Sequence, residues 1–244
     1  MTTSEYKRGE LELTRPAGDR RHPGPGRRAG RTNGSSSGIS PRTISPGTPL
    51  DLRLLVGLAA VGFTAIYFIS DLIEVGQGDF STARLSLTYA GEAAIPLFVL
   101  GLYAVQRPQI GRLGFAGALA YAYSYVFFTS TVVYALIAHT RNYEALTKVF
   151  GAWMTVHGVI LVFGGLAFGL AVVWARVLPQ WTGVCLMVGV VLVAAASGLS
   201  NVPRTVAAAF PAAAFIGMGV AVLRARARGR ASSARGAPPG VGVR

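Results

Sequence analysis

Apolar runs of membrane-spanning length follow one another from residue 54 almost to the C-terminus. Each run is about 20 residues long, the length that an α-helix needs to cross the hydrocarbon core of a bilayer. The segments between the runs contain glycine, proline and charged residues, which mark turns that return to water or lipid headgroups. The pattern predicts six transmembrane helices, over residues 54–74, 85–105, 113–138, 149–174, 181–199 and 205–223.

The two ends of the chain have a different character. Residues 1–50 are rich in glycine, proline, serine and arginine and contain almost no side chains that a core would bury. Such a segment cannot offset its ordering entropy, so we predict a disordered, basic N-terminal tail. Residues 51–225 would form the transmembrane domain and residues 226–244 a second basic tail. The predicted fold class is all-α, a polytopic membrane helix bundle.

Composition and charge favour the lipid bilayer as the partner. The chain has 244 residues, of which 52% are hydrophobic and 14% charged, whereas a soluble domain carries about 25% charged residues. The net charge of +13 comes mainly from arginines in the tails, so we expect no nucleic-acid partner. An even number of spans places both termini on the same side of the membrane, and the basic segment RARARGR (224–230) directly follows the last span. The positive-inside rule therefore predicts a multi-pass protein of the cell membrane with both termini in the cytoplasm.

Acidic residues are few, and their positions are uneven. Five of the ten lie between residue 1 and residue 51, and no acid occurs in the last hundred residues. In the predicted topology the outer face gathers the polar residues Asp71, Glu74, Asp79, Arg84, His139, Arg141, Glu144, Lys148, Asn201 and Arg204. Glu92 lies seven residues into the second span, about 10 Å deep at ~1.5 Å per residue. The cytoplasmic half of the bundle has almost no ionisable group.

Three of these acids are the candidate catalytic residues: Glu92, Asp71 and Glu74. A carboxylate in the middle of a membrane costs roughly 2.5–3.5 kcal/mol, so Glu92 is expected to face the bundle and to have a partner. Asp71 and Glu74 share a helix face, and their repulsion predicts that one of the carboxyl groups holds a proton near neutral pH. Such a group suits a general acid or a proton relay. The alternatives are a solvated helix end for Asp71 and Glu74, and a structural hydrogen bond for Glu92.

Aromatic residues are concentrated in the third span, in YAYSYVFF, where Tyr121, Tyr125 and Phe128 share one helix face. The rings are too central for an interfacial belt, and they suggest an aromatic-walled pocket that stabilises cations. The candidate substrate-binding residues are Tyr67, Tyr89, Tyr121, Tyr125, Phe128 and His157. The alternatives are packing and lipid contact for the aromatic residues, and for His157 either packing or a partnership with Glu92.

Other kinds of site are not indicated. Gly164, Gly165 and Gly169 predict a seam where helices pack closely. The chain has one cysteine and three histidines, which disfavours a metal site, and no segment resembles a phosphate loop or a nucleophile elbow. We therefore expect no metal and no cofactor.

Three segments carry a resemblance to known proteins: SDLIE (70–74), GEAAIP (91–96) and ARVLPQWTG (175–183). Over about residues 52–225 the chain resembles uncharacterised six-span membrane proteins of high-GC bacteria, which are grouped as domains of unknown function. It is also loosely similar to small membrane-embedded terpene cyclases, which place one acid after the first span and a glutamate inside the second. Those cyclases have seven spans and an aromatic residue next to this glutamate, where the present chain has Gly91 and Ala93.

Three hypotheses about function follow. In the first, the protein binds a lipophilic, isoprenoid-like molecule, and as an enzyme it would be a cyclase or isomerase with Glu92 as its acid. In the second, it is a small proton-coupled transporter or export factor that uses the same carboxyl groups as a relay. In the third, it is an accessory membrane subunit whose polar groups join helices. The scarcity of ionisable residues in the inner half favours a pocket over a conduit.

Overall fold

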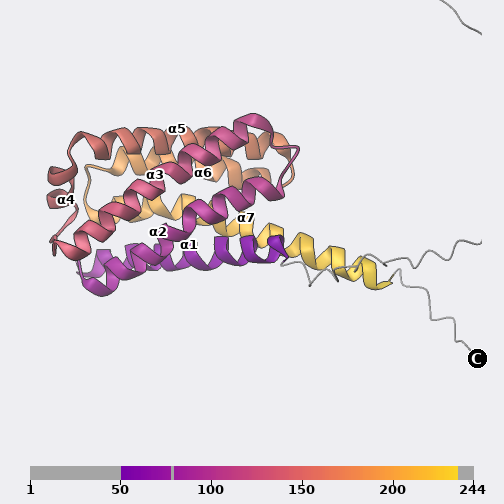
Figure 1. The fold of residues 1–244 in the computed structure, drawn as a ribbon, viewed down its shortest axis with the longest axis horizontal. Coiled ribbons are helices and arrows are strands. Elements are labelled where there is room, and N and C mark those ends of the chain that lie inside the picture. The colour runs from indigo at the N-terminus through magenta and orange to yellow at the C-terminus, as the bar shows by residue number, and fades with distance from the viewer. Residues whose placement is uncertain (1–50, 78–79, 236–244) are drawn as a thin grey trace, which may run out of the picture. The chain divides into compact units, whose positions relative to one another are not determined.

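The computed structural model describes residues 51–77 and 80–235. The predicted disordered tail and Asp79 lie outside the described residues. Within them every secondary-structure element is an α-helix and no strand occurs, which confirms the all-α class (Figure 1). The helices are α1 (Leu52–Gln77), α2 (Thr82–Val105), α3 (Gly111–Ile137), α4 (Tyr143–Phe150), α5 (Ala152–Ala175), α6 (Gln180–Ala196) and α7 (Asn201–Arg235).

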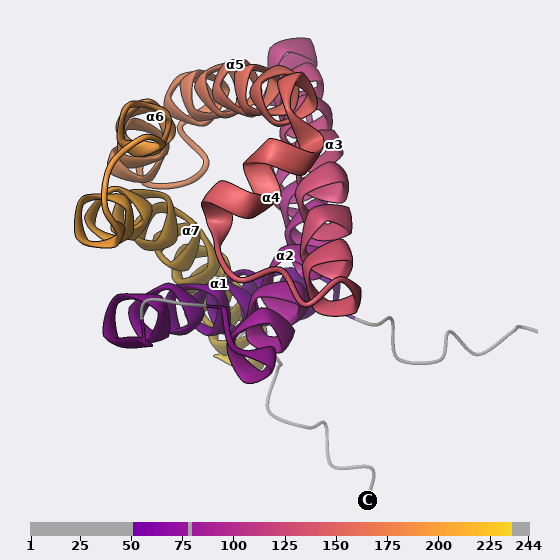
Figure 2. The same ribbon diagram turned by 90° about the vertical axis from the view of Figure 1, so that its left-hand side faces the viewer.

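The long helices form a closed ring. Each packs against the long helix before and after it in the chain, and α7 packs against α1. Figure 2, a view along the bundle, shows the short helix α4 lying across one end of this ring. We call this end the α4 end. It collects the C-terminal ends of α1, α3 and α6 and the N-terminal ends of α2, α5 and α7.

Five helices of the described chain are long and apolar enough to cross a membrane, namely α1, α2, α3, α5 and α7. The fifth predicted span corresponds to α6, an apolar helix of 17 residues that measures roughly 26 Å. A typical hydrocarbon core is about 30 Å thick. The structure is therefore that of a helical membrane protein. Five of the predicted spans correspond to helices long and apolar enough to cross a membrane, and the helix at the fifth predicted span is shorter.

Local signals explain where the helix bounds differ from the prediction. The Ser81 side chain accepts a hydrogen bond from the Arg84 backbone N–H (3.3 Å), so α2 begins at Thr82 and includes Arg84. Asn142 caps α4 in the same way, through the Ala145 N–H (3.0 Å). Gly151, at φ 50° and ψ −125°, separates α4 from α5 because only glycine adopts this backbone conformation without strain. The last helix continues beyond the predicted residue 223 to Arg235.

Small residues let the long helices approach closely. A Cβ atom on Gly117 would lie 2.4 Å from the Phe168 backbone nitrogen, and one on Gly164 would lie 2.7 Å from that of Tyr121. These two glycines make a seam between α3 and α5. A Cβ on Gly169 would lie 2.7 Å from the Gly183 carbonyl oxygen, which makes a second seam between α5 and α6. The predicted glycine seam is therefore confirmed, and it serves two neighbouring helices.

Aromatic side chains fill the middle of the ring. The rings of Tyr121 on α3 and Phe215 on α7 have centroids 5.6 Å apart, and those of Phe98 on α2 and Phe215 are 5.3 Å apart. These contacts cross the interior, because α7 is not the ring neighbour of α2 or α3. We call these three residues the aromatic plug. The surrounding core side chains, such as Phe168, Leu186 and Met218, are almost fully buried.

Candidate functional site at the α4 end

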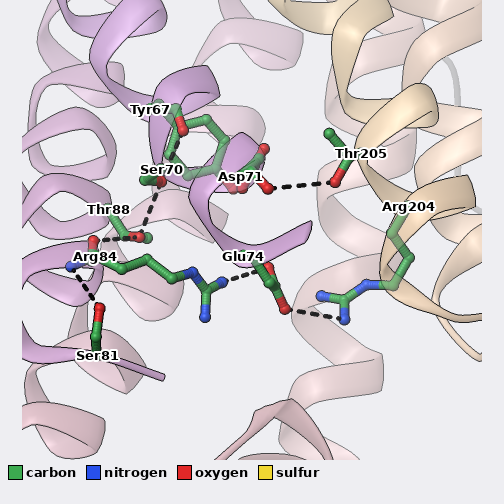
Figure 3. Close-up of polar contacts among 9 residues, drawn as sticks. All are labelled: Tyr67, Ser70, Asp71, Glu74, Ser81, Arg84, Thr88, Arg204 and Thr205. Carbon is green, nitrogen blue, oxygen red and sulfur yellow. Dashed lines mark hydrogen bonds and ion pairs between the residues drawn. The ribbon is translucent and has the colours of Figure 1, made fainter. Parts of the chain in front are cut away.

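A cluster of charged side chains joins three helices at the α4 end (Figure 3). Glu74, near the end of α1, is buried, and its Oε2 accepts a hydrogen bond from Nη2 of Arg84 on α2. Its other oxygen, Oε1, lies 3.7 Å from Nη1 of Arg204 on α7. One carboxylate is therefore shared by two guanidinium groups, and the shared charge holds α1, α2 and α7 together.

Arg84, like Arg204, is a residue of this cluster to which the sequence prediction gives no role in the site. The sequence pattern predicts a loop at the outer face for Arg84, but the structure buries it in the first turn of α2, with 7% of its side chain exposed. Its guanidinium carbon lies 4.5 Å from the centre of the Phe80 ring. Two of its nitrogens, Nε and Nη1, have no hydrogen-bond partner among the described residues. The Ser81 cap was the available signal, because a helix that starts after Ser81 must contain Arg84.

Hydroxyl groups connect the next turn of α1 to its neighbours. Thr88 on α2 donates to the Ser70 hydroxyl (3.0 Å), and Thr205 on α7 donates to the Asp71 backbone oxygen (3.5 Å) (Figure 3). Asp71 is partly buried, one helical turn deeper than Glu74. The structure therefore brings Asp71 and Glu74 into one region, as predicted, and it pairs Glu74 with Arg84 and Arg204, which the prediction places at the same face without a role in the site. The proton expected on one of the two acids stays a prediction.

Glu92 is buried between α2 and α1, with 6% of the residue exposed. Gly91 permits this arrangement, because a Cβ there would lie 2.6 Å from the Tyr67 Cβ. The close approach of the helices places the Tyr67 side chain next to the Glu92 carboxyl group. The oxygen Oε2 of Glu92 has no hydrogen-bond partner within the described part of the chain, so the carboxyl group is buried as predicted and only partly satisfied.

The predicted aromatic face is present on α3. The ring centroids of Tyr121 and Tyr125 are 5.1 Å apart, and those of Tyr125 and Phe128 are 6.2 Å apart. Tyr121 is fully buried, and Tyr125 and Phe128 are partly buried. Tyr121 and Tyr125 lie near Tyr67 and Glu92.

Two of the predicted substrate-binding residues lie elsewhere. Tyr89 is exposed on α2. His157 stacks on Phe127 of α3, with ring centroids 3.7 Å apart and planes 9° apart, and its Nδ1 lies 2.9 Å from the Trp153 carbonyl oxygen. His157 therefore takes the packing role that was the alternative for it, and it joins α3 to α5 rather than to Glu92.

A pocket of about 990 Å³ opens at the α4 end. Glu74 and Arg204 line its polar side together with Asn142, Tyr143 and Glu144 from the region of α4. Its apolar side comes from the first half of α5 and the second half of α6, including Leu161 and Val190. Phe128 is the α3 residue that reaches it, whereas Glu92 is not among the residues that line it. The arrangement therefore combines a charged wall with a long apolar wall.

The site has no obvious place for a metal. No group of three or more histidine, cysteine, aspartate or glutamate side chains suited to a metal ion occurs in residues 51–77 and 80–235.

The chain was compared with protein-family models, with curated proteins and with solved structures, and no match was found in any of the three.

Proposed function

We propose that the protein is a six-span protein of the cell membrane, with both termini in the cytoplasm, that binds a lipid-like molecule in the pocket at its α4 end. In this topology α6 is the shortest span and the α4 end faces outward. The observation that carries the proposal is the pocket itself. Its volume is about 990 Å³, at the upper end of the range of small-molecule sites. It pairs one charged wall with the apolar side chains of α5 and α6.

The packed side chains beyond the pocket support binding over conduction. On α5 the pocket is lined by residues between Met154 and Phe163, and the fully buried core residues, from Phe168 onward, follow farther along the helix. The aromatic plug crosses the ring beyond Phe128, the pocket residue on α3. A solute that entered at the α4 end would therefore meet packed side chains. This supports a pocket that receives and releases its ligand on one side.

Photo-crosslinking tests this proposal. The purified protein would be placed in nanodiscs with a fatty acid and, separately, with a fatty alcohol, each carrying the same photoreactive diazirine in its chain. If the proposal is correct, at least one probe labels the pocket segments of α5 and α6 in preference to other lipid-facing segments. Uniform labelling of all lipid-facing helices by both probes would refute it.

A pair of glycine variants supplies the matched control. Gly158 lines the pocket, and a Cβ built on it has no atom within 4 Å. Gly158→Leu should therefore fill the pocket without disturbing helix packing, and labelling of α6 should fall several-fold. Gly62 on α1 has equally open surroundings and lies outside this pocket, so Gly62→Leu should leave labelling of α6 unchanged.

Acid catalysis is a second candidate function, favoured by the buried and partly unsatisfied carboxyl group of Glu92. Glu92 would donate its proton to a carbon–carbon double bond of an isoprenoid-like substrate, and the nearby tyrosine rings would stabilise the cation. Return of a proton to Glu92 would complete an isomerisation or cyclisation without another reactant. Extraction of metabolites from a host that expresses the protein tests this, because Glu92→Gln should abolish any new lipophilic product. A product that persists in this variant would exclude Glu92 as the acid.

A further inference from the structure

One cation lines the pocket in addition to two carboxylates that are paired with other cations. Two carboxylates line it, Glu74 and Glu144, and each already has its own cation. Arg84 binds Glu74 directly, and the Lys148 ammonium lies 2.8 Å from Glu144. Arg204 is the third charged residue of the lining, and it adds one positive charge to these two neutral pairs.

Arg204 is also the more loosely held of the two arginines around Glu74. Its Nη1 lies 3.7 Å from Glu74 Oε1, and 25% of its side chain is exposed, against 7% for Arg84. The Tyr143 ring supports its guanidinium group at 4.3 Å. An arginine has five N–H donors in a planar fork that matches a carboxylate or a phosphate. Arg204 therefore has donors available to the pocket that it lines, with its guanidinium group supported by the Tyr143 ring.

Asp71 is the carboxylate that would oppose an anion here. It lies one turn deeper on α1, and its backbone oxygen accepts the hydrogen bond from Thr205, the residue next to Arg204. When Asp71 is ionised, it cancels the excess charge of Arg204. Its replacement by asparagine is therefore an informative variant, because it removes this opposing charge.

The pocket also reaches the lipid-facing surface of the bundle. The helices α5 and α6 are in contact at Gly169 and Gly183, and Gly165 packs on Val190. Toward the α4 end, Val159 and Phe163 of α5 line the pocket although they are 48% and 68% exposed. Apolar side chains with this exposure are suited to contact with lipid chains. The pocket therefore runs from Arg204 to an apolar opening between α5 and α6.

We propose that the ligand is an anionic amphiphile of the bilayer, which enters between α5 and α6 and places its carboxylate or phosphate group on Arg204. The inference rests on the proposed function and specifies its ligand class and its route. The apolar chain would lie along Val159 and Phe163, and the headgroup would lie at the polar wall. A lipid is favoured over a dissolved anion because the opening is lined by apolar side chains.

The same pair of photoreactive probes tests the inference, because the fatty acid and the fatty alcohol differ in headgroup charge alone. The acid should label the pocket segments about tenfold more strongly than the alcohol, as one charge-assisted contact implies. Arg204→Gln should remove this preference and leave labelling by the alcohol intact. Asp71→Asn should keep or increase the preference. Arg141→Gln changes an exposed arginine near the same end that does not line the pocket, and it should have no effect.

A second variant distinguishes loss of the headgroup contact from misfolding of the protein. Arg204→Lys retains the charge near Glu74 and loses the planar fork, so it should fold and show a reduced preference for the acid. A preference equal to that of the native protein in both Arg204 variants would overturn the inference. Equal labelling by acid and alcohol in the native protein would also overturn it and leave the proposed function intact. Competition by millimolar inorganic phosphate would refute the lipid route, and absence of pocket labelling by both probes would refute the proposed function itself.

Discussion

Removal of the Glu74 charge should destabilise the protein more than removal of either arginine bound to it. Glu74→Gln leaves the buried guanidinium of Arg84 without its directly bound carboxylate, and loss of one partner of a buried ion pair costs about 3–5 kcal/mol. Arg204 contributes little to this figure, because its pair distance is 3.7 Å and its side chain is 25% exposed. Pairs of this more exposed kind contribute roughly 0–1 kcal/mol.

Because Glu74 contacts two arginines, the loss of Glu74 and the loss of Arg84 should lower the free energy of unfolding by different amounts. In Arg84→Met the carboxylate keeps Arg204 as a cation, so this variant should lose less stability than Glu74→Gln. The double variant, Glu74→Gln with Arg84→Met, should regain more than half of the loss of Glu74→Gln, because no buried charge is left alone in it.

Equilibrium unfolding measures these differences. The protein would be titrated with a denaturing detergent from mild micelles, with helical circular dichroism and tryptophan fluorescence as signals. Glu144→Gln is the matched control, since the Glu144–Lys148 pair is exposed, and its unfolding curve should match that of the native protein. The reasoning would be refuted if Arg84→Met proved as costly as Glu74→Gln, or if the double variant showed no recovery.

Four further predictions concern the seams, the α4 end and Glu92. Gly117→Ala should destabilise the bundle by about 1–3 kcal/mol in the same titration, because the added methyl group would meet the α5 backbone, whereas Gly158→Ala should be neutral or slightly stabilising. Gly151→Ala should cost about 1–3 kcal/mol, since a Cβ there meets no atom and the positive φ alone opposes it. Glu92→Gln should leave the unfolding curve nearly unchanged or shift it toward higher stability, because a neutral amide is less costly to bury than a carboxylate, and a large loss would show that Glu92 is structural. The hydrogen bond and charge of Lys148 hold the pKa of Glu144 below its usual value. The small contribution of this pair to α4 is therefore present above about pH 4.3 and is lost as the pH falls through the lower folded value. The NMR shifts of α4 should follow this loss in the native protein and not in Glu144→Gln.

The sequence was sufficient to predict the long helices, because a run of about 20 apolar residues indicates a membrane-spanning helix regardless of which helices pack against it. It was also sufficient to place Glu74 and Arg204 at one end, because the alternation of spans fixes which ends meet. The helix α4 was not predicted. Residues 143–148 lie in the predicted break between spans, and residues 149–150 lie in the predicted fourth span. The position of α4 depends on Leu146 packing against Leu85 and Val132, which are distant in the sequence.

The details of the site depended on pairings that no local pattern contains. The bond between Arg84 and Glu74 crosses a turn and exists because α2 starts at Thr82. His157 could face either Glu92 or α3 from its position in the sequence, and the choice is made by the Phe127 ring that lies flat against it. The contact of α1 with α7 joins the first helix to the last. The apolar pattern of a helix does not indicate which other helix packs against it, so this contact could not be predicted.

The position of the aromatic plug decides how the hypotheses about function compare. A proton-coupled transporter must carry its solute past every layer of the ring, and here Tyr121, Phe98 and Phe215 close the interior with contacts between helices that are not neighbours. Passage would require these helices to separate, although Gly117 and Gly164 hold α3 against α5 at backbone distance. A ligand that enters between α5 and α6 needs no such change, because the pocket already reaches exposed side chains there. The same packing that opposes a conduit would therefore supply a fixed wall for the proposed ligand.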